Sequence, residues 1–231
     1  AEDDTITITV NPEDGYKLKS LTAVPEPSTI ADVPLVKQDD KTYTFAMPAA
    51  NVTVTAEFVI YSVIYSFDFE TDLTEEGWTN IDANSDEQDW ITGTNMYAKE
   101  GWGVDGSSCA ISQSYDHATG AIDADNWLFS PSVAIPAGGA TVSWYEKSQD
   151  ANYKDSYTVY VGETAVATEY NESTAPNGMK VLYAKHAAEN PWKQISVELS
   201  GEEYGGKTVC IAFRHQSYDC YMLEIDNFAV T

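Results

Sequence analysis

Hydrophobic and polar positions alternate along this chain over short stretches that turn residues separate, which is the pattern of β-strands. Residues 5–10 read Thr-Ile-Thr-Ile-Thr-Val and run into Asn, Pro, Glu, Asp and Gly at 11–15, a strand followed by turn residues. The same alternation predicts strands at 16–23, 42–47 and 51–58, with a Pro-rich loop after the first of these. We therefore expect a small β repeat domain over residues 1–61.

The remainder of the chain shows strands at spacings of roughly 8 to 15 residues, with Gly, Asn, Asp and Pro between them. This spacing is typical of a β-sandwich, and no stretch has sustained helical periodicity. The connection over Glu169–Glu189 has no clear period, and we expect it to be irregular. The expected strands of this second domain, residues 62–231, are 65–70, 107–115, 126–134, 139–147, 156–162, 192–199, 207–214 and 221–230.

Charge narrows the choice of partners. The chain has 37 Asp and Glu against 12 Lys and Arg, a formal net charge of -25, and -19 of this falls outside residues 1–58. Such a charge repels nucleic-acid phosphates and anionic membrane surfaces, so we expect neither as a partner. No run approaches the roughly 18 apolar residues that span a bilayer, so membrane insertion is not expected. Divalent cations relieve an excess of carboxylates, and this makes calcium a candidate cofactor.

One loop has the spacing of a calcium site. Asp82, Asn84 and Asp86 place oxygen side chains at positions 1, 3 and 5, as in the first half of an EF-hand loop. Position 6 is Glu87 where an EF-hand has Gly, and position 12 is Gly93 where it has Glu. We therefore expect other parts of the fold to supply the remaining ligands.

Two strands offer such ligands. Residues 67–70 alternate as Phe-Asp-Phe-Glu, which directs Glu70 away from the core. In the last strand the apolar phase slips at Asp226 and Asn227, so a bulge there would re-aim Asp226. If the terminal strands pair, Glu70 and Asp226 become neighbours near the Asp82 loop, and such crowding is unfavourable without a cation. The alternative is that all these acids are solvated turn and surface residues.

Several motifs resemble known families. VNPEDGYKLKSL and TYTFAMPAANVTVTAEF resemble the divergent internalin-type B-repeat, a spacer or stalk module of bacterial surface proteins. FDFE, GWTNIDANSDEQDW, DNWLFSP, SQDANYKDSYTVYV and IAFRHQSYDCYMLEIDNFAV together resemble the cleaved-adhesin, or choice-of-anchor J, family, which includes the adhesin domains of the gingipains. The resemblance implies a calcium-bearing jelly-roll β-sandwich that acts in adhesion, with no hydrolytic chemistry.

The resemblance also bears on the site residues. It implies that four acidic residues face the metal ion, namely Glu70, Asp82, Asp86 and Asp226. The loop itself departs from the family, because family loops often read DADGDG where this chain has DANSDE. The QDANY stretch matches the family closely, and there Asp150 or Asn152 either serves a second ion or caps a turn.

Exposed aromatic side chains could bind a sugar. Tyr97 and Trp102 lie in a polar, Gly-rich stretch, and Tyr153 lies in the predicted DANY turn, so each could stack on a pyranose ring. The alternative is that these side chains fold inward, as core aromatics do.

Nothing in the sequence indicates catalysis. No GxSxG, HExxH or P-loop pattern occurs, and we expect His215 to make structural hydrogen bonds at a strand end. We therefore predict a non-catalytic, secreted or cell-surface adhesion module of a larger bacterial protein, joined to upstream domains and binding a host protein, matrix or glycan ligand. The alternative is a carbohydrate-binding accessory domain of a secreted hydrolase or protease.

Overall fold

The computed structural model describes residues 2–13, 16–27, 33–39, 41–60, 62–92, 101–106, 108–163 and 178–231. The chain divides into two compact units, Ala1–Ser62 and Val63–Thr231. Among the described residues, no helix has the length and apolar character that a membrane span requires.

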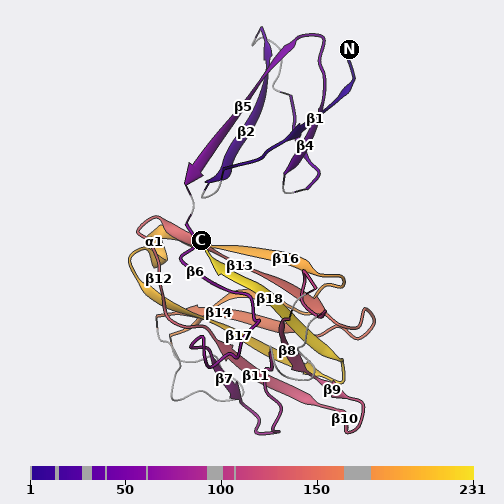
Figure 1. Ribbon diagram of the computed structural model, residues 1–231, viewed down its shortest axis with the longest axis vertical. Coiled ribbons are helices and arrows are strands. Elements are labelled where there is room, and N and C mark those ends of the chain that lie inside the picture. Colours follow the sequence, from indigo (N-terminus) through magenta and orange to yellow (C-terminus); the bar gives the residue numbers. More distant parts are fainter. Residues whose placement is uncertain are drawn as a thin grey trace. The chain divides into compact units, whose positions relative to one another are not determined.

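The first unit contains two small antiparallel sheets (Figure 1). One has the order β1-β4-β3 and the other pairs β2 with β5. Pro25 lies inside β2 opposite Val52, and a two-stranded sheet tolerates it because each strand has a free edge where no N–H is needed. The strands are β1 (Thr5–Thr9), β2 (Tyr16–Glu26), β3 (Val36–Lys37), β4 (Thr42–Ala46) and β5 (Asn51–Ile60).

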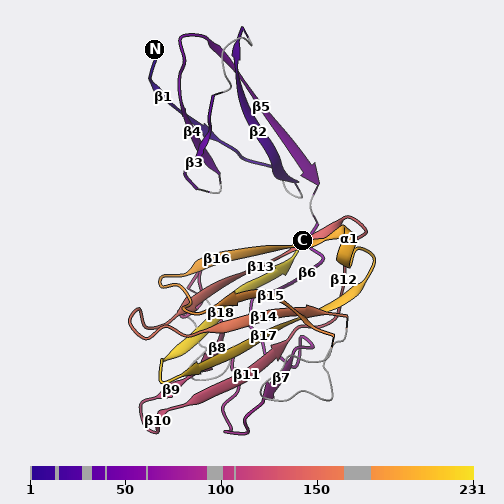
Figure 2. The same ribbon diagram turned by 180° about the vertical axis from the view of Figure 1, so that it is seen from behind.

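The second unit is a sandwich of two antiparallel sheets, seen from opposite sides in Figures 1 and 2. The six-stranded sheet has the order β15-β14-β17-β11-β7, with β12 also paired to β17. The five-stranded sheet has the order β16-β13-β18-β6, with β8 also paired to β18. A separate short hairpin pairs β9 with β10.

The bounds of these elements follow chain order. They are β6 (Tyr65–Phe67), β7 (Thr79–Asp82), β8 (Ala110–Gln113), β9 (Tyr115–Asp116), β10 (Gly120–Ala121), β11 (Asp123–Phe129), β12 (Val133–Ala134), β13 (Gly139–Ser148), β14 (Tyr157–Gly162), β15 (Lys180–Lys185), β16 (Lys193–Ser200), the single-turn helix α1 (Gly201–Tyr204), β17 (Thr208–Tyr218) and β18 (Met222–Val230).

The core lies between the two sheets and is rich in aromatic residues. Trp144 of β13 meets Phe213 of β17 edge-on, with ring centroids 5.4 Å apart, and Phe213 meets Phe228 of β18 at 6.0 Å. All three side chains are buried, so strands from both sheets contribute to one continuous apolar cluster. Burial of such large rings contributes most of the hydrophobic stabilisation of a sandwich.

The structure confirms the predicted all-β sandwich and changes some of its details. Residues 180–185, inside the stretch expected to be irregular, form β15. Among the described strands β15 pairs only with β14, and three of its six residues are exposed, Lys180, Val181 and Ala184. β7 was not expected from the sequence. The strand expected at 65–70 ends at Phe67, because Phe69 has a φ of +59°, which a bulky residue adopts rarely.

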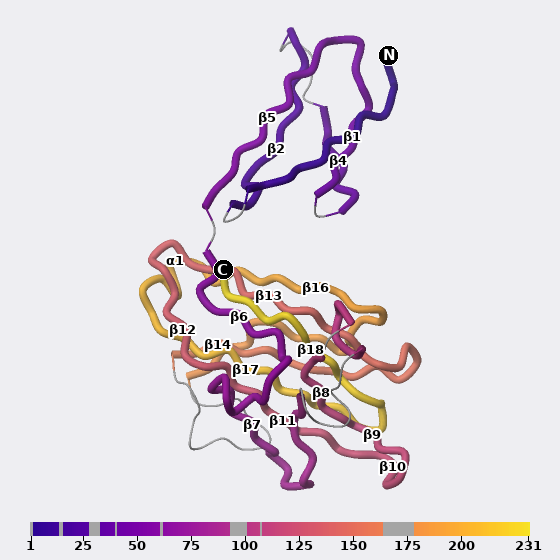
Figure 3. Tube along the Cα trace, viewed as in Figure 1, coloured from indigo at the N-terminus to yellow at the C-terminus, as the bar shows by residue number. Residues whose placement is uncertain are grey.

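The first and last strands of this unit pair, as the sequence predicts. Phe67 lies opposite Phe228 and Tyr65 lies opposite Val230. The pairing of β18 with β13 slips between Ala229 and Asp226, so β18 carries an extra residue there, and Asn227 has a φ of +47°. The predicted bulge at Asp226 and Asn227 is therefore present. The trace in Figure 3 shows how the chain crosses repeatedly from one sheet to the other before this strand ends it.

Candidate ligand-binding site

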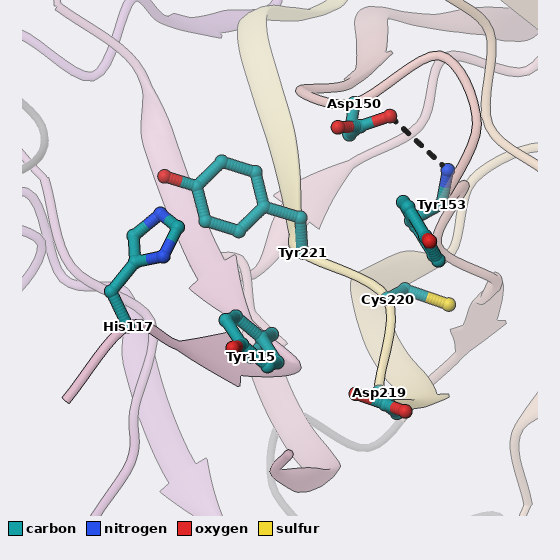
Figure 4. Close-up of a pocket in the computed structure, with 7 residues that line it drawn as sticks. All are labelled: Tyr115, His117, Asp150, Tyr153, Asp219, Cys220 and Tyr221. Atoms are coloured by element: carbon teal, nitrogen blue, oxygen red, sulfur yellow. Dashed lines mark hydrogen bonds between the residues drawn. The ribbon is translucent and has the colours of Figure 1, made fainter. Parts of the chain in front are cut away.

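A hollow of about 440 Å³ opens at the end of the sandwich where three loops meet. One loop includes β9 and the turn after it, one joins β13 to β14, and one joins β17 to β18. Figure 4 shows side chains from all three loops around the hollow. The lining residues are Tyr115, His117, Asp150, Tyr153, Asp219, Cys220 and Tyr221.

Aromatic rings line much of this pocket. Tyr115 and His117 lie edge to face with ring centroids 5.6 Å apart, and His117 lies 5.4 Å from Tyr221. These contacts hold three rings in a row along one wall. Tyr153 stands apart from them and is 60% exposed, so its ring face is available to a ligand.

Two carboxylates also face the pocket. Asp150 accepts hydrogen bonds at Oδ1 from the backbone N–H of Asn152 (2.7 Å) and of Tyr153 (3.3 Å), the second of which is drawn in Figure 4. This Asx-type turn fixes the backbone that carries the Tyr153 ring. Asp219 is exposed and has a φ of +52°, a conformation that Asp and Asn tolerate better than most residues. Asp150 thus caps a turn here, and its second predicted role, as an ion ligand, stays a prediction.

A buried polar network holds the three loops together from behind. Asp155, which is fully buried, accepts hydrogen bonds from the hydroxyls of Ser114 (2.5 Å) and Ser148 (3.1 Å) and lies 3.1 Å from Nε2 of His215. Ser114 directly precedes Tyr115, Ser148 lies two residues before Asp150, and His215 lies in the strand that leads to Asp219. One side chain therefore fixes all three pocket loops.

A second group of carboxylates lies near the bulge in β18. Asp226 is fully buried and accepts hydrogen bonds from the N–H groups of Val104 (2.8 Å) and Asn227 (2.7 Å). Burial, together with the smaller effect of the negative charges of Asp105 and Glu70, raises the pKa of Asp226 to about 7 against the opposing effect of the two hydrogen bonds. The charges of Glu70 and Asp105 therefore act on Asp226, while the role of Glu70 and Asp226 as metal ligands stays a prediction.

The backbone also positions Glu70. Its carboxylate accepts the Ser108 N–H at 2.7 Å, and its own N–H donates to Asp68 at 3.3 Å. Loops that are far apart in the sequence thus converge on Glu70 and Asp226. A bound cation would relieve the repulsion between their like charges.

The loop with Asp82, Asn84 and Asp86 forms a compact turn at the end of β7. Asp82 accepts the N–H groups of Ser85 (2.7 Å) and Glu87 (2.9 Å), and Asp86 accepts that of Gln88 (2.9 Å). The Asn84 amide donates to Asp86 and to the Asp123 carbonyl, while its Oδ1 is buried without a hydrogen-bond partner. An orphaned oxygen of this kind is compatible with a cation ligand.

This loop follows β7 of the six-stranded sheet, whereas Asp226 lies in β18 of the five-stranded sheet and Glu70 follows β6 of that sheet, and no described contact joins the two places. Across the ranges that the structure describes, no group of three or more His, Cys, Asp and Glu side chains is arranged to hold one metal ion. A calcium site here would therefore need backbone carbonyl, amide or water ligands in addition to carboxylates.

The aromatic residues singled out in the sequence are placed differently from one another. Trp102 is half-buried against a small cluster formed by Cys109, Ile111 and Met222, while Tyr153 is exposed in the pocket. Tyr97 lies outside the described residues. The sequence alone did not identify five of the residues that line the pocket, because only the fold brings their loops together. The turn at 218–221, which is rich in aromatic and acidic residues, was the one part of the sequence that could have indicated them. The five residues are Tyr115, His117, Asp219, Cys220 and Tyr221.

Comparison with known proteins gives a consistent result for both units. The family model described as Cleaved Adhesin Domain matches residues 61–230, and the one described as Divergent InlB B-repeat domain matches residues 1–61. Hemagglutinin A of Porphyromonas gingivalis is 26% identical over 242 residues, which cover 98% of this chain and 8% of that protein. Gingipain R1 of Porphyromonas gingivalis is 30% identical over 164 residues, which cover 66% of this chain and 9% of that protein.

Solved structures agree with the sequence matches. The K3 cleaved adhesin domain of Lys-gingipain from Porphyromonas gingivalis W83 superposes with a TM-score of 0.56 and 25% identity, over 73% of this chain and 97% of that domain. The K1 domain of the same protein gives a TM-score of 0.56 and 25% identity, over 72% of this chain and 96% of that domain. The chain thus matches whole domains of known structure, but it spans no more than about a tenth of the full-length relatives.

Proposed function

Because this chain belongs to the Cleaved Adhesin Domain family, which it matches over residues 61–230, we propose that it binds a ligand outside the bacterial cell through the three-loop pocket. The chain is an adhesin domain of the type found in the gingipains and in Hemagglutinin A, with a Divergent InlB B-repeat domain before it. We place it in a larger secreted or cell-surface protein, where it contacts a host protein or matrix component.

The pocket is the observation that supports this proposal best. Its rings and carboxylates come from three loops that the buried Asp155 holds in place, so the lining is organised before a ligand arrives. Preorganisation of this kind lowers the entropy lost on binding. Tyr153, at 60% exposure, offers a large apolar face that folding does not use.

A cleaved adhesin domain is a non-catalytic module, and the geometry of this chain is consistent with that role. Ser112, His215 and Asp155 form a row, with Ser112 Oγ 2.8 Å from His215 Nδ1 and Asp155 Oδ1 3.1 Å from Nε2. All three side chains are fully buried, so no substrate reaches the hydroxyl. The row therefore acts as a structural hydrogen-bond network, the role that the sequence predicts for His215.

The binding role is testable with immobilised ligands. The purified chain should bind at least one component of a panel of host extracellular-matrix and plasma proteins in surface plasmon resonance. Tyr153→Ala should weaken this binding, while Tyr218→Ala, which changes a tyrosine that is 66% exposed but lies outside the pocket, should leave it unchanged. Binding that is insensitive to Tyr153→Ala would place the adhesive surface elsewhere on the chain.

We also propose that calcium stabilises the domain. The charges of Glu70 and Asp105 both act unfavourably on the Asp226 carboxylate, and a divalent cation would relieve that repulsion. The loop with Asp82, Asn84 and Asp86 is the second place where calcium would bind, through the orphaned Asn84 oxygen and carboxylate oxygens. Calcium in either place would hold loops without taking part in chemistry.

Thermal unfolding tests the calcium proposal. Calcium that binds only the folded chain adds RT ln(1 + [Ca]/Kd), which is about 2.7 kcal/mol at 100 times Kd, so the melting temperature should rise when calcium is added to the chelated protein. The variants Asp226→Asn and Asp82→Asn each remove one carboxylate from one of the two places. The place that binds calcium is the one whose variant shows a smaller increase in melting temperature when calcium is added. An equal melting temperature with calcium and with excess chelator would contradict the proposal.

The pocket also supports a second function, that of a carbohydrate-binding accessory domain of a secreted hydrolase or protease. Tyr153 is exposed and polar groups surround it, the arrangement on which a sugar ring stacks. A glycan array decides this alternative. Binding that is lost in Tyr153→Ala would support it, and an array without signal at high protein concentration would count against it.

A further inference from the structure

We propose that the three-loop pocket takes the cationic side chain of a lysine or arginine in a protein ligand. This inference rests on the proposed binding function and names the chemistry of the partner. Its three supports are the charge of the lining, the identity of its rings and the hydrogen-bond acceptors that folding leaves available.

The charge of the lining favours a cation. Asp150 and Asp219 are its two carboxylates, and no Lys or Arg is among the described residues that line the hollow. The basic residue in the neighbouring turn, Lys154, has its Nζ 4.0 Å from Glu189, which directs its charge toward another carboxylate. With a net charge of -19 outside residues 1–58, the surrounding field repels sulfated or sialylated glycans and attracts basic segments.

The rings of the lining suit the same ligand. Tyr115, Tyr153 and Tyr221 present electron-rich faces, and a cation within about 6 Å of such a face is attracted by its quadrupole. The protein already uses this contact in its interior, where the Arg214 guanidinium lies 4.9 Å from the Trp127 ring centroid. In the pocket, Tyr153 offers an aromatic face of the same kind on a side chain that is 60% exposed.

The acceptors complete the site. The described hydrogen bonds of Asp150 both use Oδ1, so Oδ2 remains to accept from an ammonium or guanidinium group. Asp219 is exposed on the far side of Cys220 (Figure 4), so the two carboxylates face the hollow from different loops. Charge-assisted hydrogen bonds to either would orient the cation after the rings have attracted it.

A set of short peptides with blocked ends tests the inference. Each is Gly-Ser-Gly-X-Gly-Ser-Gly, where X is lysine, arginine, the uncharged analogue norleucine, or Nε-acetyl-lysine, and binding to the full chain is followed by NMR titration. Lysine or arginine should bind at least about fivefold more tightly than norleucine and acetyl-lysine, the change that a cation–π contact produces. Added salt should weaken the binding of the charged peptides alone.

Variants locate the binding. Asp219→Asn keeps the backbone conformation and removes the charge, and Tyr153→Leu removes the ring face at a residue that is mostly exposed. Each variant should lower the affinity for the lysine peptide at least about fivefold. The matched controls are Asp123→Asn and Tyr218→Leu, which are exposed and lie around a different hollow, and both should bind as the unchanged chain does.

The outcomes separate this inference from the proposed function. Equal affinity for lysine and norleucine peptides, or binding of neutral glycans in place of both, overturns the inference. If matrix proteins bind through Tyr153 but lysine and arginine peptides do not compete with them, the inference fails and the adhesive function stands. If neither peptides nor proteins bind, both fail.

Discussion

Nε2 of His215 lies 3.1 Å from Oδ1 of Asp155, and neither side chain has any exposed surface. Asp155 also accepts the hydroxyls of Ser114 and Ser148, so one carboxylate joins the elements that carry the pocket loops. A charged or polar group buried this deeply stabilises a fold only while its partners are in place.

Asp155→Ala should lower the free energy of unfolding by about 2–4 kcal/mol, because it leaves several buried polar groups without a partner. Urea denaturation followed by circular dichroism measures this loss. Asp116→Ala is the control, since Asp116 caps an exposed turn through the N–H groups of Ala118 and Thr119. This variant should lower the free energy of unfolding by no more than about 1 kcal/mol. Equal losses in both variants would refute the anchoring role of Asp155. If the alanine variant does not fold, Asp155→Asn provides the same comparison with a smaller loss.

Stability should depend on pH through Glu146. Burial raises the pKa of Glu146, and hydrogen bonds from Tyr157 and from the Glu189 N–H only partly oppose this shift. A carboxyl whose pKa is higher in the folded state contributes stability below its unfolded pKa and loses that contribution as pH rises through the folded pKa. The free energy of unfolding should therefore fall less steeply with rising pH in Glu146→Gln than in the unchanged chain. Urea titrations at several pH values measure both slopes, and parallel slopes would contradict the assignment.

Arg214→Lys should destabilise the domain by about 1–3 kcal/mol although the charge is kept. The guanidinium donates to both carboxylate oxygens of Asp125, at 2.6 and 2.7 Å, and stacks on Trp127, which a lysine cannot do together. Chemical denaturation gives the difference. Lys193→Arg, at an exposed ion pair with Glu189, is the matched control and should stay within about 0.5 kcal/mol of the unchanged chain.

The thiols should react in a fixed order. Burial raises the pKa of Cys210 to about 11 and raises that of Cys109 further, and both side chains are fully buried, whereas Cys220 is partly exposed at the pocket. A maleimide should therefore label one cysteine in the native chain and three after denaturation, as counted by mass spectrometry. The Cys220 adduct should also block ligand binding at the pocket, and Cys220→Ser should restore binding in the presence of the reagent. Native labelling at Cys210 would contradict the structure.

Alternation in the sequence was sufficient to predict the sandwich, because strands such as 139–148 bury every second residue. It did not predict β7 or β15, since a four-residue strand and an exposed edge strand have little alternation, and pairing with β11 and β14 defines them instead. The bulge at Asn227 was predictable because the apolar phase changes within one strand. The pocket was predicted only in part: Asp150 and Tyr153 share a turn motif, whereas Tyr115 and Tyr221 reach it through contacts across about a hundred residues of sequence.

The pairing of β6 with β18 has a mechanical consequence. Tyr65 and Val230 are opposite each other at one end of this pairing, and Thr231 next to them is hydrogen-bonded to Thr141, so tension applied through residues 63 and 231 acts on that end of the strands first. The strands would then separate like a zipper, one hydrogen-bonded pair after another, and not by simultaneous shear of the whole ladder. An adhesive module loaded in this way would release its terminal strand at low force and extend, which would limit the tension that reaches a ligand held in the pocket.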